Sequence, residues 1–220
     1  MARFSRVVVP GVPHHVTQRG ARRMQVFFSR DDYRAYSVLL ARQARRHALE
    51  IWAYCLMPNH CHLVAVPSTE EGLARPLGEA HRRYALRVNR RHGWTGHLWQ
   101  ERFSSFPMDE AHLMAAIRYV LLNPVRAGLA ETATSWPYSS ARAQVLGKPD
   151  QLVNPGPVAE RVSDWDEYLS RADCARQTEA LERHERIGRP LGSDDFIKRL
   201  ERITGRRLRP RKVGRKRTAK

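Results

Sequence analysis

The stretch that decides the fold is IWAYCLMPNHCHLVAV, residues 51–66. Pro58-Asn59 divides it into two short apolar runs, and Pro67 ends the second run. A short apolar run bounded by turn residues is typical of a strand buried on both faces. We therefore predict strands at 50–57 and 60–66, paired as a hairpin with its turn at Pro58-Asn59.

Further elements are predicted on both sides of this hairpin. A strand is expected at 6–9, resumed at 14–18, and its prolines restrict it to a sheet edge or a bulge. Ser29 is typical of a helix cap, and a helix is expected at 31–48. Another strand candidate lies within 97–106.

Two more helices complete the order β-α-β-β-α-β-α. The segment at 68–71 is typical of a helix cap, and the helix after it carries an apolar stripe: Leu73, Leu77, Ala80, Tyr84 and Val88. Asp109 caps the next helix, and Asn123-Pro124 ends it at about 122, because proline disfavours a helical residue before it. A hairpin excludes a wholly parallel sheet. The sequence therefore predicts an α+β fold, a ferredoxin- or RRM-like antiparallel sheet with helices packed on it.

The C-terminal third is less regular. We expect a domain at 1–142, a loop-rich and helical extension at 143–205, and a basic disordered tail at 206–220. Residues 147–175 are loop-rich, and Ser193 caps one more helix that ends at Gly205. That helix is expected to place Phe196, Leu200 and Ile203 on its apolar face.

The charge of the chain favours a polyanionic partner. Lys and Arg total 39 against 22 Asp and Glu, a net charge of +17, which is typical of nucleic-acid binding. No apolar run has the roughly 18 residues of a transmembrane helix, and no signal peptide is evident. The 3 cysteines are too few for a disulfide framework. These features predict a cytoplasmic, nucleoid-associated protein.

His60 and His62 stand two residues apart in the second strand of the hairpin. Residues i and i+2 of a strand point to the same face, about 6.6–6.8 Å apart, so both imidazoles can converge on one ion. Cys61 points to the other face and is no third ligand. Two histidines bonded to water or backbone remain an alternative.

Tyr119 and Asn123 stand one turn apart in the helix that Asp109 begins. Residues i and i+4 of a helix lie nearly on one face, so a phenol and an amide oxygen are presented together. A tyrosine at the helix flank and a capping asparagine remain the alternative. The sequence alone leaves both open.

Five segments in this order resemble the single-tyrosine HUH transposases, and most of all the REP-associated tyrosine transposases. They are HVTQRG (15–20), MPNHCHLV (57–64), LWQERF (98–103), RYVLLNPVRAGL (118–129) and WPYSS (136–140). The resemblance spans about 6–142. Cys61 departs from the bulkier hydrophobic residue that is usual between the two histidines.

The resemblance implies an active site and a reaction. It implies a divalent ion, Mg²⁺ or Mn²⁺, held by His60, His62 and the side-chain oxygen of Asn123, with Tyr119 as the nucleophile. The implied reaction cleaves and rejoins single-stranded, hairpin-forming (REP-like) DNA through a 5′-phosphotyrosine intermediate. The 1–142 domain would then be catalytic. A monomer is favoured, and a homodimer remains open.

Several side chains are candidates for holding the DNA. Phosphate contacts of arginines give affinity without sequence choice, and those expected here are Arg19, Arg22, Arg23, Arg102, Arg118 and Arg126. Trp99, Tyr84 and Phe103 are candidates for base stacking, with core packing favoured for each. His112, two turns before Tyr119, is the other histidine that we would test.

Two other functions compete with this interpretation. One is a catalytically silent binding module for structured DNA or RNA, in which the sheet and the basic tail only bind. The other is a hydrolytic metallonuclease, which the absence of an Asp/Glu cluster near the histidine motif disfavours. A covalent protein–DNA adduct would separate the three.

Overall fold

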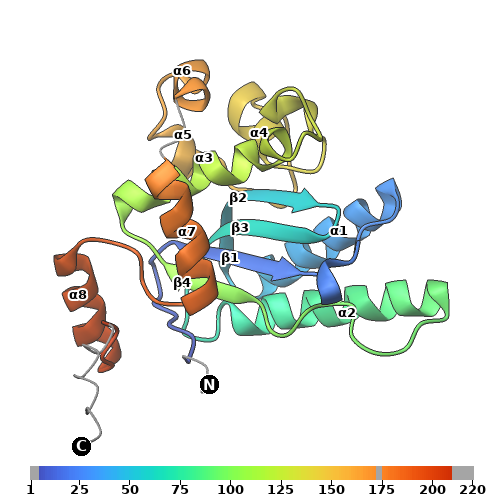
Figure 1. The fold of residues 1–220 in the computed structure, drawn as a ribbon, viewed down its shortest axis with the longest axis horizontal. Helices are drawn as coiled ribbons and strands as arrows, with labels where there is room; N and C mark the ends of the chain where they lie inside the picture. The colour runs from blue at the N-terminus through green and yellow to red at the C-terminus, as the bar shows by residue number, and fades with distance from the viewer. Residues whose placement is uncertain (1–4, 172–174, 210–220) are drawn as a thin grey trace, which may run out of the picture.

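Four antiparallel strands form one sheet in the order β2-β3-β1-β4 in the computed structural model, which describes residues 5–171 and 175–209 (Figure 1). The strands are β1 (His14–Arg19), β2 (Leu49–Met57), β3 (His60–Pro67) and β4 (Ser104–Pro107). This strand order, with its β-α-β-β-α-β connectivity, is that of a ferredoxin-like fold. The predicted fold class is confirmed.

The predicted hairpin forms β2 and β3. Met57 pairs with His60 across the Pro58-Asn59 turn, and Cys55 pairs with His62. Alternate residues of β3 enter different cores, since Cys61 and Leu63 pack on one side of the sheet and Val64 on the other. Both faces of the hairpin are therefore covered.

Helices cover the two faces of the sheet. One face packs against α1 (Arg30–Arg46) and α2 (Ala74–His92), and the other against α3 (Glu110–Arg126) and α7 (Ala175–Ile187). Figure 1 shows α7 lying across the strands beside α3. The remaining helices are η1 (Ala21–Arg23), η2 (Ala133–Ser135), α4 (Ala141–Leu146), α5 (Gly156–Ala159), α6 (Trp165–Ser170) and α8 (Asp194–Thr204).

The N-terminal strand differs from the prediction. It begins only at His14 and is central, paired with both β3 and β4, whereas we expected an edge strand or a bulge. Its prolines precede the paired residues, so they block no ladder hydrogen bond. Val7 and Val9, expected in the strand, pack against Phe196 and Leu200 of α8 instead.

Two further boundaries differ. Residues 68–71 do not cap a helix: α2 follows Leu73, which makes no side-chain cap. Of the strand predicted within 97–106, only the last part forms a strand, which is β4. The chain before β4 lies beside the end of β1, where Gly20 and Trp99 form an isolated β-bridge. The Gln18 side chain donates to the carbonyl of Gln100 at 3.2 Å, which satisfies a polar group of that irregular segment.

α3 begins as predicted but continues through Pro124 to Arg126. Asp109 accepts from the backbone N–H of His112 at 3.1 Å and is the predicted cap. Proline carries no N–H, so the helix loses one internal hydrogen bond at this point. Arg126 donates from Nη1 to the carbonyl of Tyr119 at 3.2 Å, and Pro124 itself is buried. Tertiary packing thus overrides the local proline signal.

The C-terminal third is more ordered than predicted. The spacing of apolar residues in the sequence did not predict the helices α4, α6 and α7. α8 has the expected Ser193 cap and Gly205 end, but Ile203 is 59% exposed, so its apolar face is narrower than predicted. Leu208, in the predicted tail, is buried against α8, while residues 210–220 lie outside the described residues.

No helix in the described ranges is both long and apolar enough to span a bilayer.

A buried histidine behind β3 gives a pH-dependent stability. Nε2 of His81 hydrogen-bonds with the hydroxyl of Tyr36 at 2.9 Å, and burial lowers the pKa of His81 to about 3. Between pH 6.5 and 3 the unfolded chain binds a proton at this residue that the folded chain does not, so stability falls as the pH falls through this window, by up to about 1.4 kcal/mol per pH unit.

We expect His81→Gln to flatten the slope of unfolding free energy against pH between pH 7 and 5, measured by urea denaturation. His97→Gln, at an exposed position, is the control and should keep the wild-type slope. An unchanged slope in His81→Gln would contradict the assignment.

Candidate active site

β3 presents His60 and His62 on the face that α3 and α7 cover. Their ring centroids lie 4.8 Å apart. Cys61 points to the opposite face, where its sulfur lies 3.4 Å from the hydroxyl of Tyr36. The alternation predicted from the sequence therefore holds, and both imidazoles face one site.

α3 places Tyr119 over His62. The two ring centroids are 5.4 Å apart and the rings meet edge to face. Tyr119 is 8% exposed, and Asn123, one turn later, is 9% exposed. The guanidinium carbon of Arg126 lies 4.8 Å from the centroid of the Tyr119 ring. The Tyr119 ring thus contacts both an imidazole and a guanidinium.

β1 adds two residues that sequence reasoning missed. Thr17 is directly opposite His62, and its hydroxyl lies 3.3 Å from Nδ1 of His62. Nε2 of His15 lies 3.2 Å from the same Nδ1, and the two rings stack at 5.2 Å. Alternation in HHVTQ places His15 and Thr17 on one face, but only the strand pairing shows that this face is the site.

α7 brings a carboxylate to the same place. One carboxylate oxygen of Glu185 and one ring nitrogen from each of His15 and His62 all lie within 4.8 Å of one another. Nη2 of Arg19 lies 3.5 Å from Oε1 of Glu185, 166 positions away along the chain. No local sequence signal could have predicted this contact.

Burial controls protonation in the site. It lowers the pKa of His15 to about 3, and burial together with Arg19 lowers the pKa of His60 to about 3. Burial also holds the pKa of His62 well below its usual value. All three imidazoles are therefore neutral near pH 7, and protons do not compete with a metal ion for them.

Burial has the opposite effect on the tyrosine. It raises the pKa of Tyr119, and the carboxylates of Glu185 and Glu182 act in the same direction. Arg126 and Arg19 oppose this shift. The phenol consequently keeps its proton at neutral pH in this state.

The donor atoms fit a divalent cation. Nε2 of His62 and Nδ1 of His15 are buried and have no hydrogen-bond partner among the described residues. An unsatisfied buried polar atom costs about 1–3 kcal/mol, which a bound cation could offset. Imidazole nitrogens with carboxylate or amide oxygens suit Mn²⁺ or Mg²⁺ better than a closed thiolate site would.

The arginines expected to bind DNA lie in different surroundings. Arg19 faces Glu185, and Arg126 faces Tyr119. Arg22 and Arg23 are exposed on η1 with positive φ. Arg118 is further from the site, where it donates to Gln177 and lies over the Tyr168 ring.

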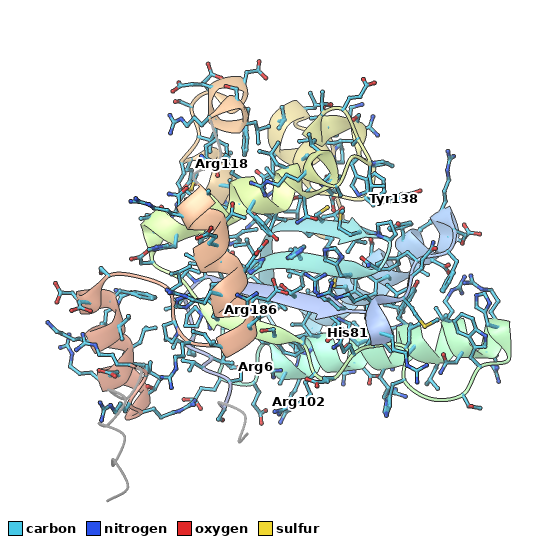
Figure 2. The ribbon with its side chains drawn as sticks, viewed as in Figure 1. Arg6, His81, Arg102, Arg118, Tyr138 and Arg186 are labelled. Carbon is cyan, nitrogen blue, oxygen red and sulfur yellow. The ribbon has the colours of Figure 1, made fainter. Side chains whose placement is uncertain are left out.

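A basic cavity of about 220 Å³ opens beside Glu185, between β4 and α7. Arg102, which the sequence selected, lines it together with Arg6 and Arg186, which it did not. Figure 2 shows these three arginines near the lower end of α7. Three guanidiniums around one small cavity can hold a phosphate.

The other candidates belong to the framework. Nδ1 of His112 lies 2.6 Å from Oδ1 of the helix cap Asp109, outside the cluster of site histidines. Trp99, Tyr84 and Phe103 are buried in the core with α1 and α2, as favoured from the sequence. They are not exposed for base stacking.

Comparison with known proteins places the chain among transposases. A family described as "Transposase IS200 like" matches residues 9–122. A Haemophilus influenzae protein named "Putative REP-associated tyrosine transposase" is 26% identical over 110 residues, which cover 45% of this chain and 62% of that protein. The match therefore spans less than two thirds of the relative's length.

A solved structure shares the fold. It is described as a REP-associated tyrosine transposase bound to a REP hairpin, and it superposes with a TM-score of 0.57. The sequence identity is 20%, and the alignment covers 70% of this chain and 92% of the other.

His62 is the residue on which ion binding should depend. We expect Mn²⁺ to raise the thermal midpoint of the wild-type protein, because a ligand that binds only the folded state stabilises it by about 2.7 kcal/mol at a hundred times its Kd. His62→Ala should abolish this increase. His112→Ala, outside the cluster, should retain it, and loss of the increase in both variants would contradict the assignment.

Proposed function

This chain belongs to the IS200-like transposase family, and on that premise we propose that it cleaves and rejoins single-stranded, hairpin-forming DNA of the REP type through a 5′-phosphotyrosine at Tyr119. The observation that carries the proposal is the Tyr119 ring, 5.4 Å from the ring of His62. Attack on a cation-bound phosphate needs a nucleophile close to the cation, and the Tyr119 ring lies beside the imidazole of a proposed cation ligand.

Tyr119 is the proposed nucleophile. Its oxygen forms a bond to the scissile phosphorus while the bond to the 3′-oxygen breaks, and the phenol proton leaves as the 3′-oxygen gains one. The reverse step rejoins the strands, because the phosphotyrosine is itself a phosphodiester. Burial raises the pKa of Tyr119, and Arg126 and Arg19 oppose that rise and so favour loss of its proton.

His60, His62 and Asn123 are the residues proposed to hold the divalent ion, Mg²⁺ or Mn²⁺. The ion would offset the charge that develops on a non-bridging phosphate oxygen. The histidines are neutral near pH 7, so they can bind it without first losing a proton. Asn123 stands one helical turn after the nucleophile, on the same helix.

The DNA is proposed to follow the basic surface around the site. Arg19 and Arg126 would act next to the nucleophile, whereas Arg22 and Arg23 would act from η1. Arg102 would act from the basic cavity, and Arg118 from α3, where it contacts Gln177 near the start of α7. In this proposal 1–142 is the catalytic domain, 143–205 is an extension and 206–220 is a tail that adds phosphate contacts. The protein would act in the cytoplasm, associated with the nucleoid, as a monomer or as a homodimer.

A second candidate function is binding of structured DNA or RNA without catalysis. The observation that favours it is Tyr119 itself, 8% exposed and with a raised pKa. A silent module needs no accessible nucleophile, and the charge of +17 alone supports binding.

A covalent-adduct assay separates the two functions. With hairpin single-stranded DNA and Mn²⁺, we expect wild-type protein to form a protein–DNA adduct that survives SDS, and Tyr119→Phe to form none. Tyr138→Phe is the matched control, because Tyr138 stacks on Tyr33 outside the site and should keep the adduct. An adduct in Tyr119→Phe would exclude this nucleophile, and a nicked product without any adduct would indicate a hydrolytic nuclease.

The basic cavity should contribute to DNA binding. We expect Arg186→Ala to weaken binding of single-stranded DNA and to reduce the slope of log affinity against log salt by about 1, because one phosphate contact is lost. Arg142→Ala, at an exposed position on α4, is the control and should change neither quantity. Equal losses in both variants would indicate only a general effect of charge.

A further inference from the structure

α7 lies outside the segment that matches the family, yet it is fixed against the site. The match ends at residue 122, and α7 begins at Ala175. Leu181 of α7 is buried in the core with α3, and His184 packs on Phe106 of β4 with ring centroids 5.8 Å apart. The hydroxyl of Ser104 donates to the carbonyl of Glu185. The backbone that carries Glu185 is therefore held at the sheet.

The side chain of Glu185 is directed into the site. It is 14% exposed, and its carboxylate is close to one nitrogen each of His15 and His62, all within 4.8 Å. Its ion-pair contact with Arg19, at 3.5 Å, is at the long limit of a hydrogen bond. The Thr17 hydroxyl is its other partner, and a carboxylate has further lone pairs with which it can bind a cation.

The two imidazoles are spaced as neighbouring ligands of one ion. Nε2 of His15 and Nδ1 of His62 are 3.2 Å apart. Two ligands about 2.2 Å from one ion and at right angles to each other are about 3.1 Å apart, which is the octahedral geometry of Mg²⁺ and Mn²⁺. Two histidines and one carboxylate form a common set for divalent metals.

We propose that His15, His62 and Glu185 bind a divalent cation, so that a helix outside the family segment supplies the carboxylate ligand of the active site. This inference deepens the proposed function, because His62 also belongs to the set with His60 and Asn123. A neutral imidazole has one nitrogen lone pair for a metal ion, so His62 serves one of the two sets at a time: Nδ1 faces His15, and the buried Nε2 is the nitrogen available to the other set.

A second glutamate on α7 provides a control for the loss of negative charge. Glu182 lies one turn before Glu185, is exposed, and is not part of the cluster. Glu182→Gln removes the same charge from the same helix without removing a proposed ligand. An effect of Glu185→Gln that Glu182→Gln lacks is therefore local to Glu185 and is not due to the general charge of the helix.

The test is a titration with Mn²⁺ without DNA, in which the electron paramagnetic resonance signal reports the free ion. We expect Glu185→Gln to weaken Mn²⁺ binding by roughly 10- to 100-fold or more, since even the loss of an outer-shell partner has that effect. Glu182→Gln should bind as the wild type does. His15→Gln should weaken binding as Glu185→Gln does.

Wild-type affinity in Glu185→Gln, or an equal loss in Glu182→Gln, would overturn the inference. So would full dependence on His60 and Asn123 with none on His15. The thermal midpoint without metal confirms that each variant is folded, and Glu185→Asp, which keeps the carboxylate, should bind more tightly than Glu185→Gln.

The outcomes for the site and for the reaction are separable. If Mn²⁺ binding depends on Glu185 but the wild type forms no DNA adduct, the cation site stands and the proposed reaction fails. If the adduct depends on Tyr119 while Glu185→Gln binds Mn²⁺ normally, the reaction stands and this site fails.

Discussion

The two-residue alternation of β3 is the constraint on which the rest of the structure depends. It places Cys61 and Leu63 in the core with α1 and α2, while His60, His62 and Val64 face α3 and α7. A slip of one residue in pairing would exchange the two faces, putting imidazoles into an apolar core. Packing of Cys61 and Leu63 in the apolar core therefore sets the strand register that also places His60 and His62 in the site. The same register determines both the stability of the sheet and the geometry of the site.

Desolvation then determines the chemistry of that face. The same burial that keeps the imidazoles neutral keeps the Tyr119 phenol protonated. Neutral imidazoles are ready to bind a cation, whereas a protonated phenol is a weak nucleophile. Positive charge close to the phenol opposes this effect, and Arg126 and Arg19 act in that direction.

The C-terminal extension lies against the candidate site, although the family match ends before it. α7 packs on α3 and on β1 and β4, and it brings Glu185 to the histidines and Arg186 to the basic cavity. Both side chains lie near the turn of α7 that His184 anchors on Phe106. One packing contact thus positions a negative group toward the histidines and a positive group toward the basic cavity.

The sequence by itself determined the features that depend on local geometry: the hairpin, the shared face of His60 and His62, the Asp109 cap, and the one-turn spacing of Tyr119 and Asn123. Strand and helix periodicity set these whatever the rest of the chain does. Tertiary structure alone decided that β1 is a central strand and that α3 continues through Pro124. It also decided that His15, Thr17 and Glu185 lie close to His62. These features depend on pairing and packing between segments that are far apart in the chain. There the free energy of burial outweighs the local conformational preference of single residues, and the spacing of residues along the sequence does not show which of them are close in space.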